Sequence, residues 1–135
     1  MRQISSIYVH HSASSQKKTT VAMIDEWHKD RGWSGIGYHF VITFDGSIHR
    51  GRDVSKTGAH CRGHNKYSIG ICVTGNFQND LVGTHQQASL LLLLDGLMTQ
   101  YGLQKTDVYG HREHGNTQCP GDDLFAFLTT WRGDE

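Results

Sequence analysis

The stretch Tyr109-Gly110-His111-Arg112-Glu113-His114-Gly115-Asn116-Thr117-Gln118-Cys119-Pro120-Gly121 combines histidine, hydroxyl and thiol side chains in a segment broken by glycines. This composition is typical of a loop that binds a metal rather than of a helix or strand that passes through a core. Imidazole and thiolate ligands together favour zinc. We therefore expect His111 and Cys119 to be metal ligands.

A third ligand has to come from elsewhere in the chain, because a catalytic zinc site has three protein ligands and keeps its fourth position open. The segment Ile7-Tyr8-Val9-His10-His11-Ser12-Ala13 has the pattern of a strand that ends in two adjacent histidines. Successive side chains of a strand point to opposite faces. One metal can therefore use only one of the two histidines, and the residues alone leave open which.

The bulk composition predicts one domain over residues 1–135, because this length can bury a single core. Thirteen basic and thirteen acidic residues balance, so the sequence carries no electrostatic signature of a nucleic-acid partner. The most apolar window, residues 90–94, is too short to span a membrane. The start of the chain lacks a signal-peptide pattern. We expect a soluble protein that is made in the cytoplasm.

The three cysteines differ in their expected roles. An odd count in a cytosolic protein argues against a disulfide framework. We expect Cys61 and Cys72 to be buried thiols and Cys119, beside histidine-rich sequence, to be a ligand.

The first half of the chain predicts a helix over 19–31, capped by Thr19 or Thr20, and then two strands, 37–44 and 47–50, joined at Asp45-Gly46. Residues 51–67 are expected to form a surface loop that borders a site. The apolar, β-branched run 68–75 predicts a central strand that is buried on both faces.

The second half predicts a long helix from Thr84, with Gln87 completing a capping box, to Gln100 or Tyr101 before Gly102. A short strand over 107–109 should deliver His111, and a last helix over 124–131 should be capped by Asp122 or Asp123. Strands that alternate with helices indicate a mixed α/β domain.

Five motifs in register carry a resemblance to a known family. They are Val9-His10-His11-Ser12-Ala13, Gly37-Tyr38-His39-Phe40, Gly58-Ala59-His60, Asn65 with Ser68-Ile69-Gly70-Ile71, and Gly110-His111-Arg112-Glu113 with Cys119-Pro120-Gly121. The chain resembles the zinc-dependent N-acetylmuramoyl-L-alanine amidases, and among them the T7-type phage lysozymes and the peptidoglycan recognition proteins. The resemblance covers nearly the whole chain.

The resemblance implies a single α/β domain with a central mixed sheet flanked by helices and a zinc site at one end of the sheet. It selects the first histidine after the strand, so the implied Zn²⁺ ligands are His10, His111 and Cys119. The implied reaction is hydrolysis of the amide between N-acetylmuramic acid and L-alanine in peptidoglycan.

The resemblance also implies roles for four other residues. Tyr38 matches the active-site tyrosine, whose hydroxyl would stabilise the oxyanion or position water; without the family context it would be an ordinary strand tyrosine. Thr117 stands where T7-type lysozymes have a catalytic lysine and amidase-active recognition proteins have threonine; otherwise it would serve only the loop's turn. His60 and Asn65 are expected to contact substrate, the alternative being hydrogen bonds within the loop.

Several further residues have open roles. His39 either orients a ligand or is satisfied by the backbone. Glu113 could be proposed as a general base, but its family counterpart belongs to the hydrogen bonding of the loop. Trp27 is expected in the core and Trp33 in the wall of the substrate groove.

The preferred function is a phage or prophage endolysin that acts as a monomer and reaches the cell wall after the membrane is breached. A peptidoglycan-binding module without activity is disfavoured because Cys119 is present. A recycling amidase is disfavoured because such relatives carry carboxylates at the positions of Tyr38 and Cys119. A regulator that inhibits a phage RNA polymerase, as T7-type lysozyme does, is the remaining alternative, and the short N-terminus weakens it.

Overall fold

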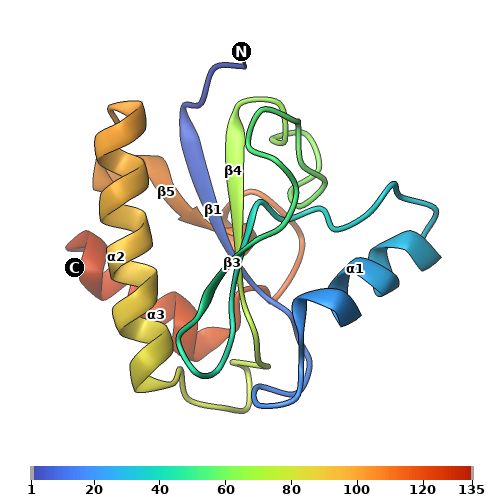
Figure 1. Cartoon of the computed structure of the whole chain (residues 1–135). Helices are drawn as coiled ribbons and strands as arrows, with labels where there is room; N and C mark the ends of the chain where they lie inside the picture. Colours follow the sequence, from blue (N-terminus) through green and yellow to red (C-terminus); the bar gives the residue numbers. More distant parts are fainter. Residues whose placement is uncertain (1, 135) are drawn as a thin grey trace.

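The computed structural model describes residues 2–134, so the two end residues of the predicted domain lie outside it. Its elements are β1 (Ser6–His11), α1 (Val21–Asp30), β2 (Phe40–Ile42), β3 (Ile48–Arg50), β4 (Ser68–Val73), α2 (Thr84–Tyr101), β5 (Val108–Gly110) and α3 (Asp122–Arg132), with short 3-10 turns at Lys105–Asp107 and His111–Glu113. Figure 1 shows the sheet between helices on both sides. The predicted α/β fold is confirmed.

The five strands lie in the order β3-β2-β4-β1-β5. Strand β1 pairs in parallel with both β4 and β5, β2 is parallel to β4, and only β3 is antiparallel. All six residues of β4 are buried, which confirms a central strand covered on both faces. Because parallel strands run the same way, the carboxyl ends of β1 and β5 lie together at one edge of the sheet.

Helices α2 and α3 cover one face of the sheet (Figure 1). The inward side of α2 carries Leu90, Leu94 and Leu97 at helical spacing, and all three are buried. They pack with the β-branched residues of β1 and β4 and with Leu124 and Leu128 of α3 in the larger core. This core therefore fixes the strands from one side.

The other face is covered by α1 and by the loop 51–67 (Figure 1). Its core is small and consists of Ile24, Ile36, Val41 and Cys72. His10 is the register partner of Cys72 on the neighbouring strand, so both side chains point to this face. His11 points to the opposite face, where its Nδ1 accepts a hydrogen bond of 3.2 Å from the amide of Phe77.

The N-terminus of α2 differs from the prediction in both its cap residue and the partner of that residue. Gly83, not Thr84, caps α2, and Gln86 rather than Gln87 accepts from its amide at 3.2 Å. Gln86 is selected because its buried amide also donates to the Thr74 carbonyl at 2.9 Å, a tertiary contact that local sequence does not reveal.

The start of α3 also differs from the prediction. Its cap is Gly121, with φ +88°, and Asp122 is the first helical residue. The carboxylate of Asp123 instead accepts from the amide of Val82 at 2.8 Å. The prediction that Trp27 lies in the core was also wrong, because 37% of its surface is exposed.

Among the described residues, no helix combines the length and apolar character that crossing a membrane requires.

The unequal burial along α2 yields a stability prediction. Leu90→Ala removes a side chain with 0% exposure and should lower the free energy of unfolding by about 2–5 kcal/mol. Leu92→Ala, on the same helix but 71% exposed, should change it by less than about 0.5 kcal/mol. Urea unfolding followed by circular dichroism measures both, and equal losses would contradict the assigned face of α2.

Candidate metal centre

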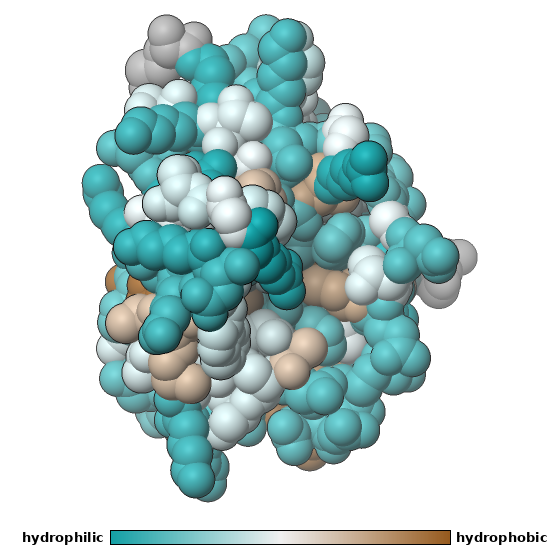
Figure 2. Space-filling view, turned by 90° about the vertical axis from the view of Figure 1, so that its right-hand side faces the viewer, coloured by the Kyte–Doolittle hydropathy of each residue, from teal (hydrophilic) through white to brown (hydrophobic). Residues whose placement is uncertain are grey.

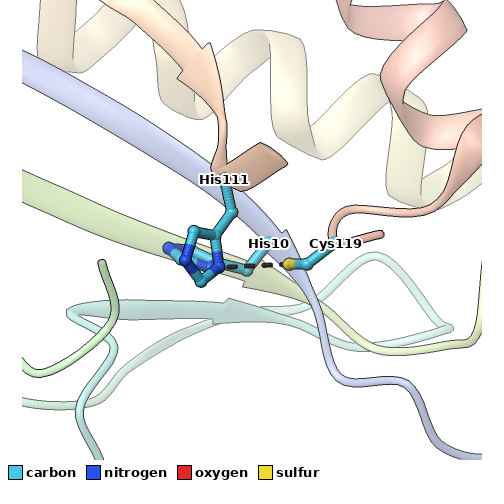
Figure 3. Close-up of side chains that lie close together, drawn as sticks. All are labelled: His10, His111 and Cys119. Atoms are coloured by element: carbon cyan, nitrogen blue, oxygen red, sulfur yellow. Dashed lines mark hydrogen bonds between the residues drawn. The ribbon is translucent and has the colours of Figure 1, made fainter. Parts of the chain in front are cut away.

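Two strand ends and one loop bring His10, His111 and Cys119 together (Figure 3). His10 lies at the end of β1, and His111 directly follows β5, the parallel neighbour of β1. One ligand atom from each of the three residues lies within 4.8 Å of the others, and Cys119 Sγ is 3.6 Å from His10 Nδ1. The three predicted ligands therefore form one cluster.

Backbone hydrogen bonds fold the loop so that Cys119 returns to the histidines. The amide of Arg112 donates to the Cys119 carbonyl at 2.8 Å, which closes the loop across its base. The Cys119 sulfur accepts from the amide of His11 at 3.4 Å, and the Cys119 amide donates to the Thr117 hydroxyl at 3.2 Å. The thiol thus has a fixed place beside the end of β1.

Glu113 is engaged away from the cluster. Its carboxylate forms a two-pronged ion pair with Arg132, with contacts of 2.8 and 2.9 Å. It also accepts from the Gly110 amide at 2.8 Å. Glu113 therefore fastens the ligand loop to α3, as expected of a residue in the loop's hydrogen bonding, and its oxygens are not free to act as a general base.

Burial sets the protonation states in the cluster. It lowers the pKa of His10 well below its usual 6.5 and also lowers that of His111, so both imidazoles are neutral at pH 7. It raises the pKa of the Cys119 thiol to about 12. Two neutral imidazoles and one thiol that can lose its proton form a donor set that suits zinc.

A cavity of about 420 Å³ opens beside the cluster, between α1 and the loop 51–67. Tyr38, His60, Asn65 and His111 all line it, so the loop borders this cavity. Figure 2 shows the α1 side of the molecule, where mostly hydrophilic residues surround smaller apolar patches.

Tyr38 lies between α1 and the cluster of His10, His111 and Cys119. Its ring centroid is 5.0 Å from that of His10, and its side chain packs against Cys72. Burial raises the pKa of its hydroxyl well above the usual 10, so the group is a neutral hydrogen-bond donor at pH 7. Thr117 is exposed on the ligand loop. The catalytic roles of Tyr38 and Thr117 stay predictions.

His60 contacts His10, which the sequence did not predict, whereas Asn65 makes hydrogen bonds within the loop, its alternative role. His60 Nδ1 lies 3.0 Å from Nε2 of His10, and burial lowers the pKa of His60 to about 3, which keeps its ring neutral. Asn65 Oδ1 accepts from the amides of His60 and Cys61, both at 2.9 Å. Their contact with substrate stays a prediction.

Two glycines, Gly58 and Gly70, are the sequence feature that relates to the contact between His60 and His10. A Cβ at Gly70 would lie 2.5 Å from the His60 ring, and one at Gly58 would lie 2.7 Å from it. His39, the other candidate for orienting a ligand, has its Nδ1 occupied by the Gly70 amide at 3.0 Å. Both thiols outside the cluster, Cys61 and Cys72, are buried and free, as predicted.

Residues 1–122 match the protein family described as N-acetylmuramoyl-L-alanine amidase. The chain is 37% identical over 124 residues to the endolysin of Escherichia phage T7, covering 87% of this chain and 81% of that protein. It is 35% identical over 131 residues to peptidoglycan-recognition protein SC2 of Drosophila melanogaster, covering 91% and 71%. The solved structure of N-acetylmuramoyl-L-alanine amidase LysC from Clostridium intestinale superposes with a TM-score of 0.88 at 38% identity, covering 99% and 88%.

The protonation states predict how metal affinity depends on pH. The Cys119 thiol is protonated below about pH 12 in the metal-free protein, whereas both histidines are already neutral above pH 6.5. Binding should therefore release at least one proton, that of Cys119, and zinc affinity should rise at least roughly tenfold per pH unit between about pH 6.5 and 8.5, where the acidified water adds to the slope. Calorimetry in buffers of different ionisation enthalpy counts this proton. Cys61→Ser should release the same number, and a pH-independent affinity would contradict the assignment.

Proposed function

The chain belongs to the N-acetylmuramoyl-L-alanine amidase family, and we propose that it hydrolyses the amide between N-acetylmuramic acid and L-alanine in peptidoglycan with the help of a zinc ion. The observation that carries the proposal is the cluster of His10, His111 and Cys119, whose ligand atoms lie within 4.8 Å of one another beside a cavity. Three ligands leave one position open, as hydrolytic zinc sites require. Zinc, when bound, supplies a Lewis acid that polarises the scissile carbonyl and makes water more acidic.

The cavity lining supports an anionic substrate. It includes the guanidinium groups of Arg31 and Arg62, and none of its residues is a carboxylate. Trp33, which also lines it, stacks under Arg31, with the guanidinium carbon 5.4 Å from the ring centroid. Trp33 therefore forms part of the cavity wall. Stem peptides carry free carboxylates, so this lining attracts them and an apolar ring holds one of the cations in place.

Tyr38 is the residue best placed to act on the reacting carbonyl. Its neutral hydroxyl can donate a hydrogen bond to the developing oxyanion, and its ring lies beside that of His10, with the centroids 5.0 Å apart. Thr117 has a smaller role. Its oxygen accepts from the Cys119 amide, which leaves its hydroxyl proton free to donate to water or substrate.

In the cell, this activity fits an endolysin. The endolysins of phages T7 and K11 are 37% and 34% identical to this chain. We propose that the protein is made in the cytoplasm and degrades the cell wall as a monomer once the membrane is breached.

The reaction is tested on purified peptidoglycan. Incubation should release new L-alanine amino groups, a chelator should abolish the release, and added zinc should restore it. His10→Ala and Cys119→Ala should bind no zinc and be inactive. New reducing ends in place of amino groups would identify a glycosidase and overturn the proposal.

Tyr38→Phe separates catalysis from metal binding. The variant should keep one zinc per chain but lose about 100-fold or more in rate, because a single oxyanion donor has an effect of this size. Tyr67→Phe, at a tyrosine that is 48% exposed, is the matched control and should retain the wild-type rate. Full activity of Tyr38→Phe would show that its hydroxyl has no catalytic role.

A further inference from the structure

A buried chain of hydrogen bonds leads away from the ligand His10 into the protein. His10 Nε2 lies 3.0 Å from His60 Nδ1, and His60 Nε2 lies 3.2 Å from the Ser68 hydroxyl. That hydroxyl in turn donates to the backbone carbonyl of His64 at 2.7 Å. His10, His60 and Ser68 are 1%, 8% and 0% exposed, so all three side chains are buried.

The backbone carbonyl of His64 fixes the direction of every hydrogen bond in this series. A carbonyl only accepts, so the single hydroxyl proton of Ser68 is committed to His64. The Ser68 oxygen must then accept from His60 Nε2, which leaves His60 Nδ1 without a proton. His60 Nδ1 consequently accepts from His10 Nε2. The proton of His10 is thereby held on Nε2, and its Nδ1, which faces Cys119 Sγ at 3.6 Å, is bare.

The surroundings hold the His60 ring in this orientation. Gly70 and Gly58 provide space for it, since a Cβ at either position would lie 2.5 or 2.7 Å from a ring atom. Asn65 fixes the backbone by accepting from the amide of His60 at 2.9 Å. Side chain and backbone are thus both constrained, as expected of a group that positions a ligand.

We propose that His60 is a positioning residue that prepares His10 to bind the metal through Nδ1. Both ring nitrogens of His60 make contacts inside the protein, one of them with His10. Partners of this kind fix the tautomer and orientation of a metal-bound histidine. The proposal rests on the metal site of the proposed function, but it does not depend on which bond the enzyme cleaves.

Zinc affinity, measured by competition with a chromophoric chelator, tests the proposal without any substrate. His60→Leu fills the space but removes the acceptor, and it should weaken zinc binding about 10- to 100-fold. His60→Asn places an amide oxygen where Nδ1 stood, and it should bind zinc within about threefold of wild type because the acceptor is kept. Equal losses in the two variants, or wild-type affinity in His60→Leu, would overturn the proposal.

His28→Asn is the matched control for a buried histidine in the same cavity. His28 is 5% exposed, lines the cavity and accepts from the Gly37 amide at 2.8 Å through Nδ1, but it lies outside the chain of hydrogen bonds from His10. Its replacement should leave zinc affinity unchanged. Thermal unfolding of the metal-free variants establishes that each is folded before affinities are compared.

The wild-type protein provides a second measurement that needs no variant. In the metal-free state, long-range ¹H–¹⁵N spectra of the imidazoles should show His10 and His60 both protonated at Nε2 and bare at Nδ1. A proton on Nδ1 of His10 would overturn the proposal. If wild-type protein failed to cleave peptidoglycan while the zinc affinities followed the predicted order, the proposed reaction would be wrong and the role of His60 would stand.

Discussion

The parallel pairing of β1 with both β4 and β5 is the constraint on which the site depends. Because the three strands run the same way, their carboxyl ends meet at one edge of the sheet, where chains of this architecture commonly bind ligands. His10 lies at the end of β1 and His111 directly after β5, although about a hundred residues separate them in sequence. Cys119 is not at a strand end. It is brought to the histidines by a loop that is closed by the hydrogen bond from the Arg112 amide to the Cys119 carbonyl.

One face of the sheet packs against the large hydrophobic core, and the other face contains the candidate metal site. Successive residues of β1 point alternately to the large core under α2 and α3 and to the face with the cluster of candidate ligands. His10 and His11 therefore have separate surroundings. The second face has a small apolar core, and polar side chains, among them His10, His60 and Ser68, are buried beside it. Burying these groups is tolerated because each is hydrogen-bonded, and the same burial keeps the imidazoles neutral and able to bind a metal.

The sequence predicted the fold class, the central strand, the bordering loop and two of the clustered residues, His111 and Cys119, from local patterns. The choice of His10 over His11 came from the resemblance to a family, because the strand pattern left both open. Tertiary contacts account for what it missed. Gln86 caps α2 because it also reaches Thr74, and Asp123 bonds Val82 rather than the start of its own helix. The contact between His60 and His10 joins positions fifty residues apart. Its trace in the sequence was indirect: the glycines at 58 and 70, which leave room for an imidazole ring.

X-ray absorption at the zinc K-edge of the zinc-loaded protein tests the central claim most directly, because it identifies the donor atoms without reference to activity. We expect one zinc bound by two imidazole nitrogens at about 2.0–2.1 Å, one sulfur at about 2.3 Å and one light atom from water. A shell without sulfur, with two or more sulfurs, or with a single imidazole would contradict the assignment of His10, His111 and Cys119 as the three ligands.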